Sequence, residues 1–325
     1  MTSPIATHIL RRSLHLVPVL LGVSFLAFAV VNLAPGDPAQ IILQRQTGEP
    51  PSSDAVLRLR EEMGLDAPFL NRYGIWLRHA VTGDLGTSFR TGRPVLATLV
   101  YPFPNTLRLA SVALLLAIAI SLPLGVLAAV RQNSLVDHLS RVAALMGASV
   151  PGFLLGYILI LFFAVTLRWL PVAGSDGWRH LVLPALTLGL GEAAALTRLT
   201  RASMLEVLAE DYVRTARAKG VPNRLVVTRH ALRNALSAMV TLSGIRFGRL
   251  LGGAVIIETV FARPGIGKTI VDSIQDRDYP TIQGFILITG TVFVAVNLIV
   301  DLSYFWVDPR VRLPEGATAV RKSAV

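Results

Sequence analysis

Six long apolar segments constrain the fold of this chain more than any other feature. Each approaches or exceeds the ~20 apolar residues that a helix needs to cross a bilayer. The predicted spans are residues 14–33, 109–130, 142–167, 181–196, 235–257 and 282–300, and the third is interrupted by Pro151 and Gly152. Because backbone polar groups cannot stay unpaired in hydrocarbon, each span is expected to be helical. The segments therefore predict an all-α membrane protein with six transmembrane helices.

The first span could instead be a cleaved signal peptide. Its apolar region is longer than the roughly 7 to 15 residues of a signal sequence, and no small-x-small cleavage site stands out. We therefore interpret residues 14–33 as a retained membrane helix that follows Arg11 and Arg12.

Composition supports a membrane protein and offers no catalytic chemistry. Of the 325 residues, 53% are hydrophobic and 16% are charged, which is too apolar for an ordinary soluble domain. The chain has no cysteine, so disulfides, thiolate metal sites and cysteine nucleophiles are excluded. The histidines show no metal-ligand spacing, and no Ser-His-Asp arrangement is evident. The six histidines are His8, His15, His79, His138, His180 and His230. We predict a non-catalytic protein with no metal site and no directly bound cofactor.

Two regions between the apolar segments are polar. Residues 34–102 contain several prolines and balanced charge, which predicts an external subdomain with helices near 56–63 and 69–81. Residues 200–236 are charged but helix-forming, which predicts a loop in water between two spans. In this loop Met204, Leu208 and Tyr212 recur at helical spacing, Gly220 can end that helix, and Asn223 can cap a second one.

The distribution of basic residues predicts the orientation. With the amino terminus in the cytoplasm, most Arg and Lys residues of the short flanks lie inside, as the positive-inside rule requires. The predicted inside residues are Arg11, Arg12, Arg131, Arg141, Arg198, Arg201, Arg214, Arg217, Lys219, Arg224, Arg229, Arg233, Arg310, Arg312, Arg321 and Lys322. The short external loops hold only Arg168, Arg179, Arg263, Lys268 and Arg277. Both termini and the central loop are thus predicted to be cytoplasmic.

The central loop also resembles a known family. The runs DYVRTARAKG at 211–220 and RHALRNAL at 229–236 resemble the coupling loop of dipeptide/oligopeptide/nickel permeases of ABC importers. In the general importer pattern, Glu-Ala-Ala, three residues, Gly, nine residues and Ile-x-Leu-Pro, the glycine falls on Gly220. Arg214 and Thr215 replace the first Glu-Ala, and His230 and Arg233 replace the Ile and Pro, as in the peptide-permease variant. Ala238 stands where many relatives have proline.

The resemblance extends over nearly the whole chain. It includes APGDP at 34–38, MGLD at 63–66, GDLGTS at 83–88, ETVF at 258–261 and PGIG at 264–267. The 262–269 segment also ends like a phosphate-binding loop, but Ala262 stands in place of the first glycine and the predicted topology puts it outside the cell. The glycines at 265 and 267 are instead expected to permit a tight reversal between the last two spans.

The resemblance implies a type I ABC importer permease in a bacterial inner membrane. It implies four parts: residues 1–33 with the first helix, an external subdomain at 34–102, a permease core at 103–308 that includes the coupling loop 200–236, and a cytoplasmic tail at 309–325. The implied partners are a second related permease, two cytoplasmic ATPase subunits or domains that use ATP and Mg, an extracytoplasmic substrate-binding protein and the lipid bilayer. No nucleic-acid partner is expected.

Two sets of site residues are predicted. The ATPase-coupling residues are Glu210, Asp211, Tyr212, Arg214, Thr215, Ala216, Arg217, Ala218, Lys219 and Gly220. Arg246, Arg249 and Glu258 lie within or near apolar spans, where charge is costly. They are predicted either to line the translocation path or, together with Glu192, to form packing ion pairs; for Glu258, near the external end of its span, a structural or gate role is expected.

The function expected from the resemblance is import of short peptides. Nickel chelates, glutathione or another small solute are the alternatives within the family, and no residue discriminates among them. An ATP-independent channel or secondary transporter is the alternative from another class, but the paired inverted repeats and carboxylate relay it would need are not visible.

Overall fold

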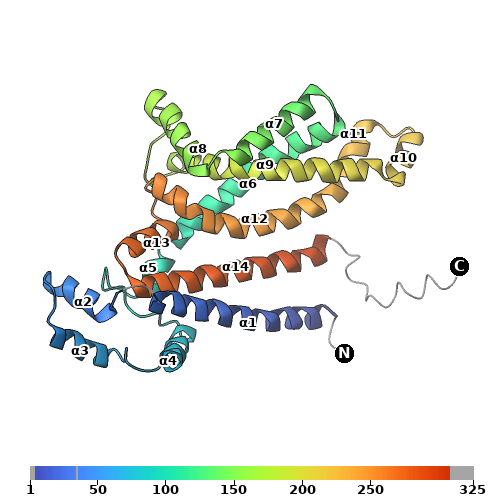
Figure 1. Cartoon of the computed structure of the whole chain (residues 1–325). Coiled ribbons are helices and arrows are strands. Elements are labelled where there is room, and N and C mark those ends of the chain that lie inside the picture. The colour runs from blue at the N-terminus through green and yellow to red at the C-terminus, as the bar shows by residue number, and fades with distance from the viewer. Residues whose placement is uncertain (1–3, 34–35, 308–325) are drawn as a thin grey trace. The chain divides into compact units, whose positions relative to one another are not determined.

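The computed structural model describes residues 4–33 and 36–307, and these are almost entirely helical (Figure 1). The predicted tail at 309–325 and the first two residues of APGDP lie outside the described residues. Within the described residues, four helical segments are long and apolar enough to cross a membrane: Leu16–Leu33, Val95–Val130, Arg179–Ala209 and Tyr279–Val300. The number rises to six if each of two bent helix pairs is counted as one span. The chain is therefore an all-α protein of the predicted class.

The bent pairs are the third and fifth predicted spans, and the third bends at the interruption expected from Pro151 and Gly152. Leu135–Ser149 and Gly152–Thr166 meet at 102°, so residues 142–167 do not form one straight helix. Val150 is extended because Pro151 disfavours the helical conformation for the residue before it. The fifth pair, Met239–Gly252 and Ala254–Val260, bends by 46° directly after Gly252.

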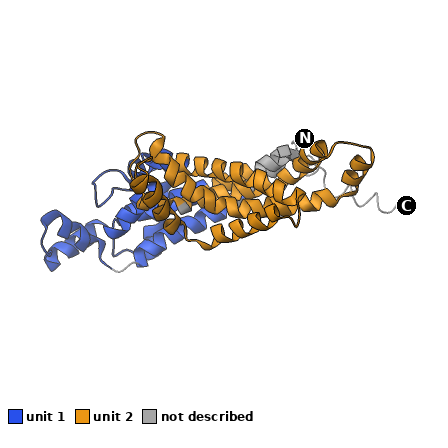
Figure 2. Cartoon of the chain, turned by 90° about the horizontal axis from the view of Figure 1, so that it is seen from above, with its two compact units in different colours: residues 1–107, 262–292 blue, residues 108–261, 293–325 orange. Residues whose placement is uncertain are grey.

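Contact clustering divides the chain into two compact units, coloured in Figure 2. Unit 1 comprises residues 1–107 and 262–292, and unit 2 comprises residues 108–261 and 293–325. Helices α6 (Phe103–Val130) and α14 (Tyr279–Val307) each contribute residues to both units. The other helices of unit 1 are α1 (Pro4–Leu33), α2 (Pro38–Thr47), α3 (Ser53–Glu62), α4 (Phe69–Val81), α5 (Val95–Val100) and α13 (Ile266–Gln275).

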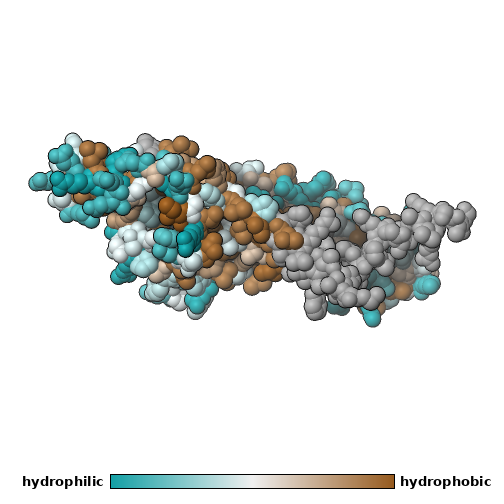
Figure 3. All heavy atoms as spheres, turned by 90° about the horizontal axis from the view of Figure 1, so that it is seen from below, coloured by the Kyte–Doolittle hydropathy of each residue, from teal (hydrophilic) through white to brown (hydrophobic). Residues whose placement is uncertain are grey.

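Unit 1 contains the predicted external subdomain, and hydrophilic residues gather over α2 and α3 at the left of Figure 3. The predicted helices near 56–63 and 69–81 correspond to α3 and α4, and Gly64 has the positive φ expected after the first. Asp278 joins the end of the GDLGTS motif to the start of α14 through hydrogen bonds. Its fully buried carboxylate accepts hydrogen bonds from Ser88 Oγ (2.5 Å), Phe89 N (2.8 Å) and Thr281 Oγ1 (2.8 Å).

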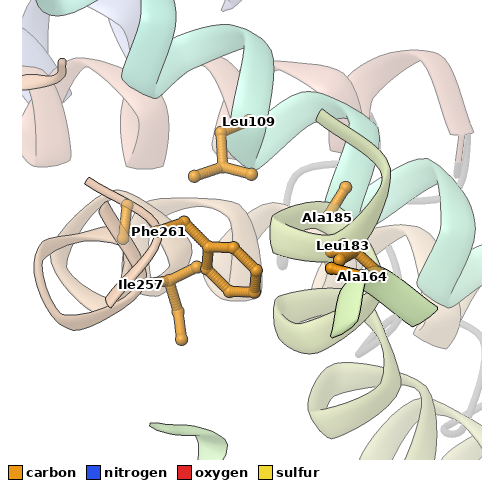
Figure 4. Close-up of a cluster of buried hydrophobic side chains, with 7 residues drawn as sticks. Leu109, Ala164, Leu183, Ala185, Ile257 and Phe261 are labelled. Carbon is orange, nitrogen blue, oxygen red and sulfur yellow. The ribbon is translucent and has the colours of Figure 1, made fainter. Parts of the chain in front are cut away.

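Unit 2 is built around α9 (Arg179–Ala209), which packs against α7 (Leu135–Ser149), α8 (Gly152–Leu159) and α12 (Leu232–Val260). The π-helical segment η1 (Ile160–Thr166) continues α8. One apolar cluster joins Leu109, Ala164, Leu183, Ala185, Ile257 and Phe261 (Figure 4). The Phe261 ring points from the end of α12 toward Leu183 and Ala164. This core holds the long helices that carry the candidate site.

Candidate functional site

The predicted coupling loop begins with a break that the periodicity did not reveal. Helix α9 ends at Ala209, Glu210 is extended (φ −66°, ψ 146°), and α10 runs over Asp211–Ala218. The expectation of one helix through Met204 and Tyr212 is therefore wrong. The Glu210 carbonyl accepts the first hydrogen bonds of α10, from Val213 N (3.0 Å) and Arg214 N (3.2 Å). The break turns α10 into a separate short helix.

Gly220 ends this helix as predicted. Its φ of +76° is left-handed, its N–H donates to Arg217 O (2.9 Å), and Val221 N donates to Ala216 O (3.2 Å). This bonding satisfies the last carbonyls of the helix in a conformation that favours glycine. A Cβ at Gly220 would meet no atom within 4 Å, so the requirement for glycine comes from the backbone conformation.

The second predicted helix of the loop differs from expectation. Asn223 does not cap it: the cap position is Pro222, and Asn223 is the first residue of α11 (Asn223–Leu225). The chain continues through the π-helical segment η2 (Val226–Ala231) directly into α12. Beyond the Gly220 corner, the loop therefore leads into a membrane-spanning helix rather than forming a short helix of its own.

Most of the predicted coupling residues are exposed. All ten are exposed except Ala216, which is half-buried. Asp211 and Arg214 form an exposed ion pair (3.4 Å) whose side chains are 96% and 76% accessible. Arg217 and Lys219 are also exposed, so the outer surface of α10 offers both signs of charge. Such a surface can select a partner of complementary charge.

Val213 anchors α10, although its role was not predicted from the sequence. Its side chain is fully buried, as is that of Val226 in η2. Tyr212 is 42% exposed, and its hydroxyl accepts a hydrogen bond from Asn234 Nδ2 (2.6 Å). The break at Glu210 changes the helical register, so that the side chain of Val213 is buried against the protein. A helical periodicity counted from Met204 does not predict this burial. Together these contacts fix α10 against α9 and the start of α12.

A buried ion pair supports the helix that leads into α10. Asp137 of α7 is fully buried and accepts hydrogen bonds from Arg201 Nε (2.6 Å) and Nη2 (2.8 Å). Asn133 N also donates to Asp137 (3.0 Å). Arg201 was predicted only as a cytoplasmic positive charge, and Asp137 was not predicted at all. A bidentate pair of this kind fixes the relative position of two helices.

The charges within the fifth span differ in their surroundings. Arg246 Nη1 donates to Glu192 Oε2 (2.9 Å), and their side chains are 21% and 17% accessible. This contact agrees with the packing alternative for that pair. Arg249 is exposed, whereas Glu258 is fully buried. A role of Arg246, Arg249 and Glu258 in the translocation path stays a prediction.

The 262–269 segment is not built like a phosphate-binding loop. Gly265 is extended and precedes α13, while the left-handed residue is Ala262 (φ +45°), so the expectation that these glycines make the reversal is wrong. Lys268 Nζ contacts both carboxylate oxygens of Asp272 (2.9 and 3.0 Å). Ile266 N donates to Thr106 Oγ1 (3.0 Å). The lysine and the start of the helix are thus occupied by the protein itself.

A bundle of long apolar helices that carries a short, exposed charged helix is the architecture expected of a membrane permease. Two family models match: "Binding-protein-dependent transport system inner membrane component" over residues 121–313 and the corresponding N-terminal family over residues 5–110. The chain belongs to this family of binding-protein-dependent inner membrane components.

Known relatives agree with this assignment. The chain is 43% identical over 305 residues to the glutathione transport system permease protein GsiC of Escherichia coli strain CFT073, covering 94% of this chain and 98% of that protein. The same protein of Shigella dysenteriae serotype 1 gives the same identity and coverage. The inward-facing MetNI methionine ABC transporter has a similar fold, with a TM-score of 0.54 at 22% identity, covering 64% of this chain and 95% of that one. The chain is therefore an ABC importer permease, a multi-pass protein of the inner membrane.

Proposed function

We propose that this permease forms half of the translocation path of an ATP-driven importer for short peptides, glutathione among them. The 43% identity to glutathione permeases supports a small peptide-like substrate. A second, related permease completes the path, and an extracytoplasmic binding protein delivers the substrate to the subdomain at residues 34–102. The ATP-independent alternative loses its support because the chain belongs to a binding-protein-dependent family.

The observation that carries the proposal is the construction of α10. Its exposed residues include Asp211, Arg214 and Arg217, while Val213 is buried beneath them. A partner ATPase that binds this surface would push on a helix that packs against α9 and η2 and is hydrogen-bonded to Asn234 at the start of α12. Closure of the ATPase pair is thereby converted into a change of the path between two states.

The remaining roles follow from this arrangement. ATP and Mg are bound and hydrolysed by two partner ATPase subunits, and the permease itself is non-catalytic. The positive-inside distribution supports a cytoplasmic location for α10 and for both termini. Arg246, Arg249 and Glu258 contribute polar groups to the path, with Arg246 held by Glu192.

Gly220→Pro tests the coupling role. Proline fixes φ near −65°, which is incompatible with +76°, and it removes the N–H that donates to Arg217 O. We expect the importer reconstituted in liposomes to hydrolyse ATP but to transport little glutathione per ATP. Gly177→Pro is the matched control, because Gly177 is a loop glycine of the same unit with φ +81° and open space around it. Equal transport per ATP by the two variants would refute the coupling role.

A further inference from the structure

Unit 1 contains a cavity of about 520 Å³ to which the proposed function assigns no role. Its walls come from the end of α1, from α3 and α4, and from the start of α14, with Phe28, Met63 and Tyr279 among its lining residues. This volume falls within the roughly 300 to 1,000 Å³ of small-molecule sites, and the mixture of apolar walls and a few polar groups is typical of them.

Two arginines line this cavity, and their partners differ. Arg60 is neutralised: it donates to Asp66 Oδ1 (2.7 Å from Nη2) and to Asp37 Oδ2 (2.5 Å from Nη1). These hydrogen bonds raise the pKa of Arg60 above its ordinary value. Asp37 is likewise compensated, because it pairs with Arg60 and accepts from Ala39 N at the start of α2. The negative charge of Asp37 is therefore neutralised within the protein and does not repel an anion in the cavity.

Arg72 has only neutral partners. Its Nη2 donates to Asn32 Oδ1 (2.6 Å), and its guanidinium lies 6.0 Å from the centre of the Phe28 ring. Among the described residues, no carboxylate lies within 4.0 Å of Arg72. Burial lowers the pKa of this guanidinium, the nearby positive charge of Arg60 lowers it further, and the negative charge of Asp66 opposes them only in part. A guanidinium has five N–H donors, so several remain for a ligand.

Gln283 supplies a second, independent indication of a ligand. It lines the same cavity and is only 7% exposed. Its Nε2 is buried and has no hydrogen-bond partner in the part of the chain that the structure describes. Buried amide donors are almost always paired in native proteins, because an unpaired one is costly. An acceptor atom supplied from outside the chain would satisfy this donor.

We infer that this cavity binds an oxyanion, with the guanidinium of Arg72 and the amide of Gln283 as donors to its oxygens. Arginine matches the paired oxygens of a carboxylate or phosphate, and Phe28 and Met63 contact the apolar part of the ligand. Two sources offer this chemistry: the carboxylate of a small solute in transit and the phosphate of a lipid headgroup. Only the first source rests on the proposed function.

Binding to the permease in nanodiscs, with its co-purifying subunits, tests the inference without ATP. Trp76 reports on the cavity, because its ring lies 5.7 Å from that of Phe28. The probes are glutathione, its diethyl ester and inorganic phosphate, each added to the permease in phosphatidylcholine nanodiscs. In a separate experiment, the permease is placed in phosphatidylglycerol nanodiscs, where the lipid itself is the candidate ligand. We expect glutathione to change the fluorescence, and Arg72→Gln and Gln283→Leu each to weaken its binding about tenfold, the effect of one lost charge-assisted or buried hydrogen bond.

The controls separate binding from folding and from coupling. Arg78→Gln, an exposed arginine on the same helix, should leave binding unchanged. Gln283→Leu removes a buried unpaired donor, so it should not lower the melting temperature even if Arg72→Gln does. If glutathione binds and its diethyl ester does not, the ligand group is the carboxylate of the solute. If only phosphate or phosphatidylglycerol gives a response, and that response requires Arg72, the ligand group is the phosphate of a lipid headgroup. No Arg72-dependent binding of any probe would overturn the inference, whatever the result at Gly220.

Discussion

Asp137 and Arg201, 64 positions apart in the chain, form a bidentate ion pair between the start of α7 and the last part of α9. Arg201 lies eight residues before the end of α9 at Ala209, and α10 follows that end directly. The pair therefore fixes the segment from which α10 emerges. A force applied to α10 reaches a rigid helix only if this segment is held in place.

Breaking this pair should weaken both folding and coupling. Asp137→Asn leaves a partly buried guanidinium without its counter-charge, which costs about 3 to 5 kcal/mol when such pairs are broken. We expect a lower melting temperature of the purified permease and less transport per ATP. Arg198→Lys, an exposed change on the same helix, should alter neither. A melting temperature of Asp137→Asn equal to that of Arg198→Lys would show that the pair does not stabilise the fold.

Two glycines on α9 should respond oppositely to the same substitution. A Cβ at Gly189 would lie 2.8 Å from the Ala113 carbonyl oxygen of α6, whereas one at Gly191 would meet nothing within 4 Å. Gly189→Ala should therefore destabilise the permease by about 1 to 3 kcal/mol, the usual cost of overpacking. Gly191→Ala should be neutral or slightly stabilising, since alanine favours helix.

Thermal unfolding in one detergent measures both glycine variants. The comparison keeps the helix and the added methyl group constant and varies only the space around it. If Gly189→Ala melted at the same temperature as Gly191→Ala, the result would contradict the close packing of α6 against α9 at Gly189.

The Glu192–Arg246 pair should behave as a coupled unit. Its members lie on α9 and α12, 2.9 Å apart and largely shielded from solvent. A double-mutant cycle of Glu192→Gln and Arg246→Gln should give an interaction energy within the ~0.5 to 3 kcal/mol found for contacting residues. In the same assay, Arg249→Gln and Glu192→Gln should be additive, because Arg249 is exposed. Additivity of the Glu192 and Arg246 changes would argue against the pair.

Local features of the fold could be predicted from the sequence. The apolar segments predicted helices, and the Gly220 corner was predicted because glycine and the following Pro222 act within a few residues. The break at Glu210 was missed, since it depends on how the chain packs as well as on local propensity. For Val150 the adjacent proline was a visible signal, although its 102° consequence was not.

The contacts of the charged residues were only partly predicted: pairing with Glu192 was one of two alternatives, and the Asp137–Arg201 pair was not expected. Arg201 and Arg246 were seen as cytoplasmic or membrane-embedded charges, but their partners Asp137 and Glu192 lie 64 and 54 positions away. No local pattern links such residues before the helices pack. Val213 was missed for a related reason: its burial depends on the new register that begins after Glu210.

Site-specific crosslinking tests the central claim that α10 is the docking element for a partner ATPase. The chain has no cysteine, so one introduced thiol is its only reactive sulfur. Thr215→Cys places it on the exposed surface of α10, and Ser175→Cys places it in the loop before α9 as a control. In membranes that contain the assembled importer, a short thiol-to-amine crosslinker should join the Thr215→Cys chain to an ATPase-sized subunit and leave the Ser175→Cys chain unlinked. Crosslinking to the ATPase from Ser175→Cys, with none from Thr215→Cys, would contradict the account.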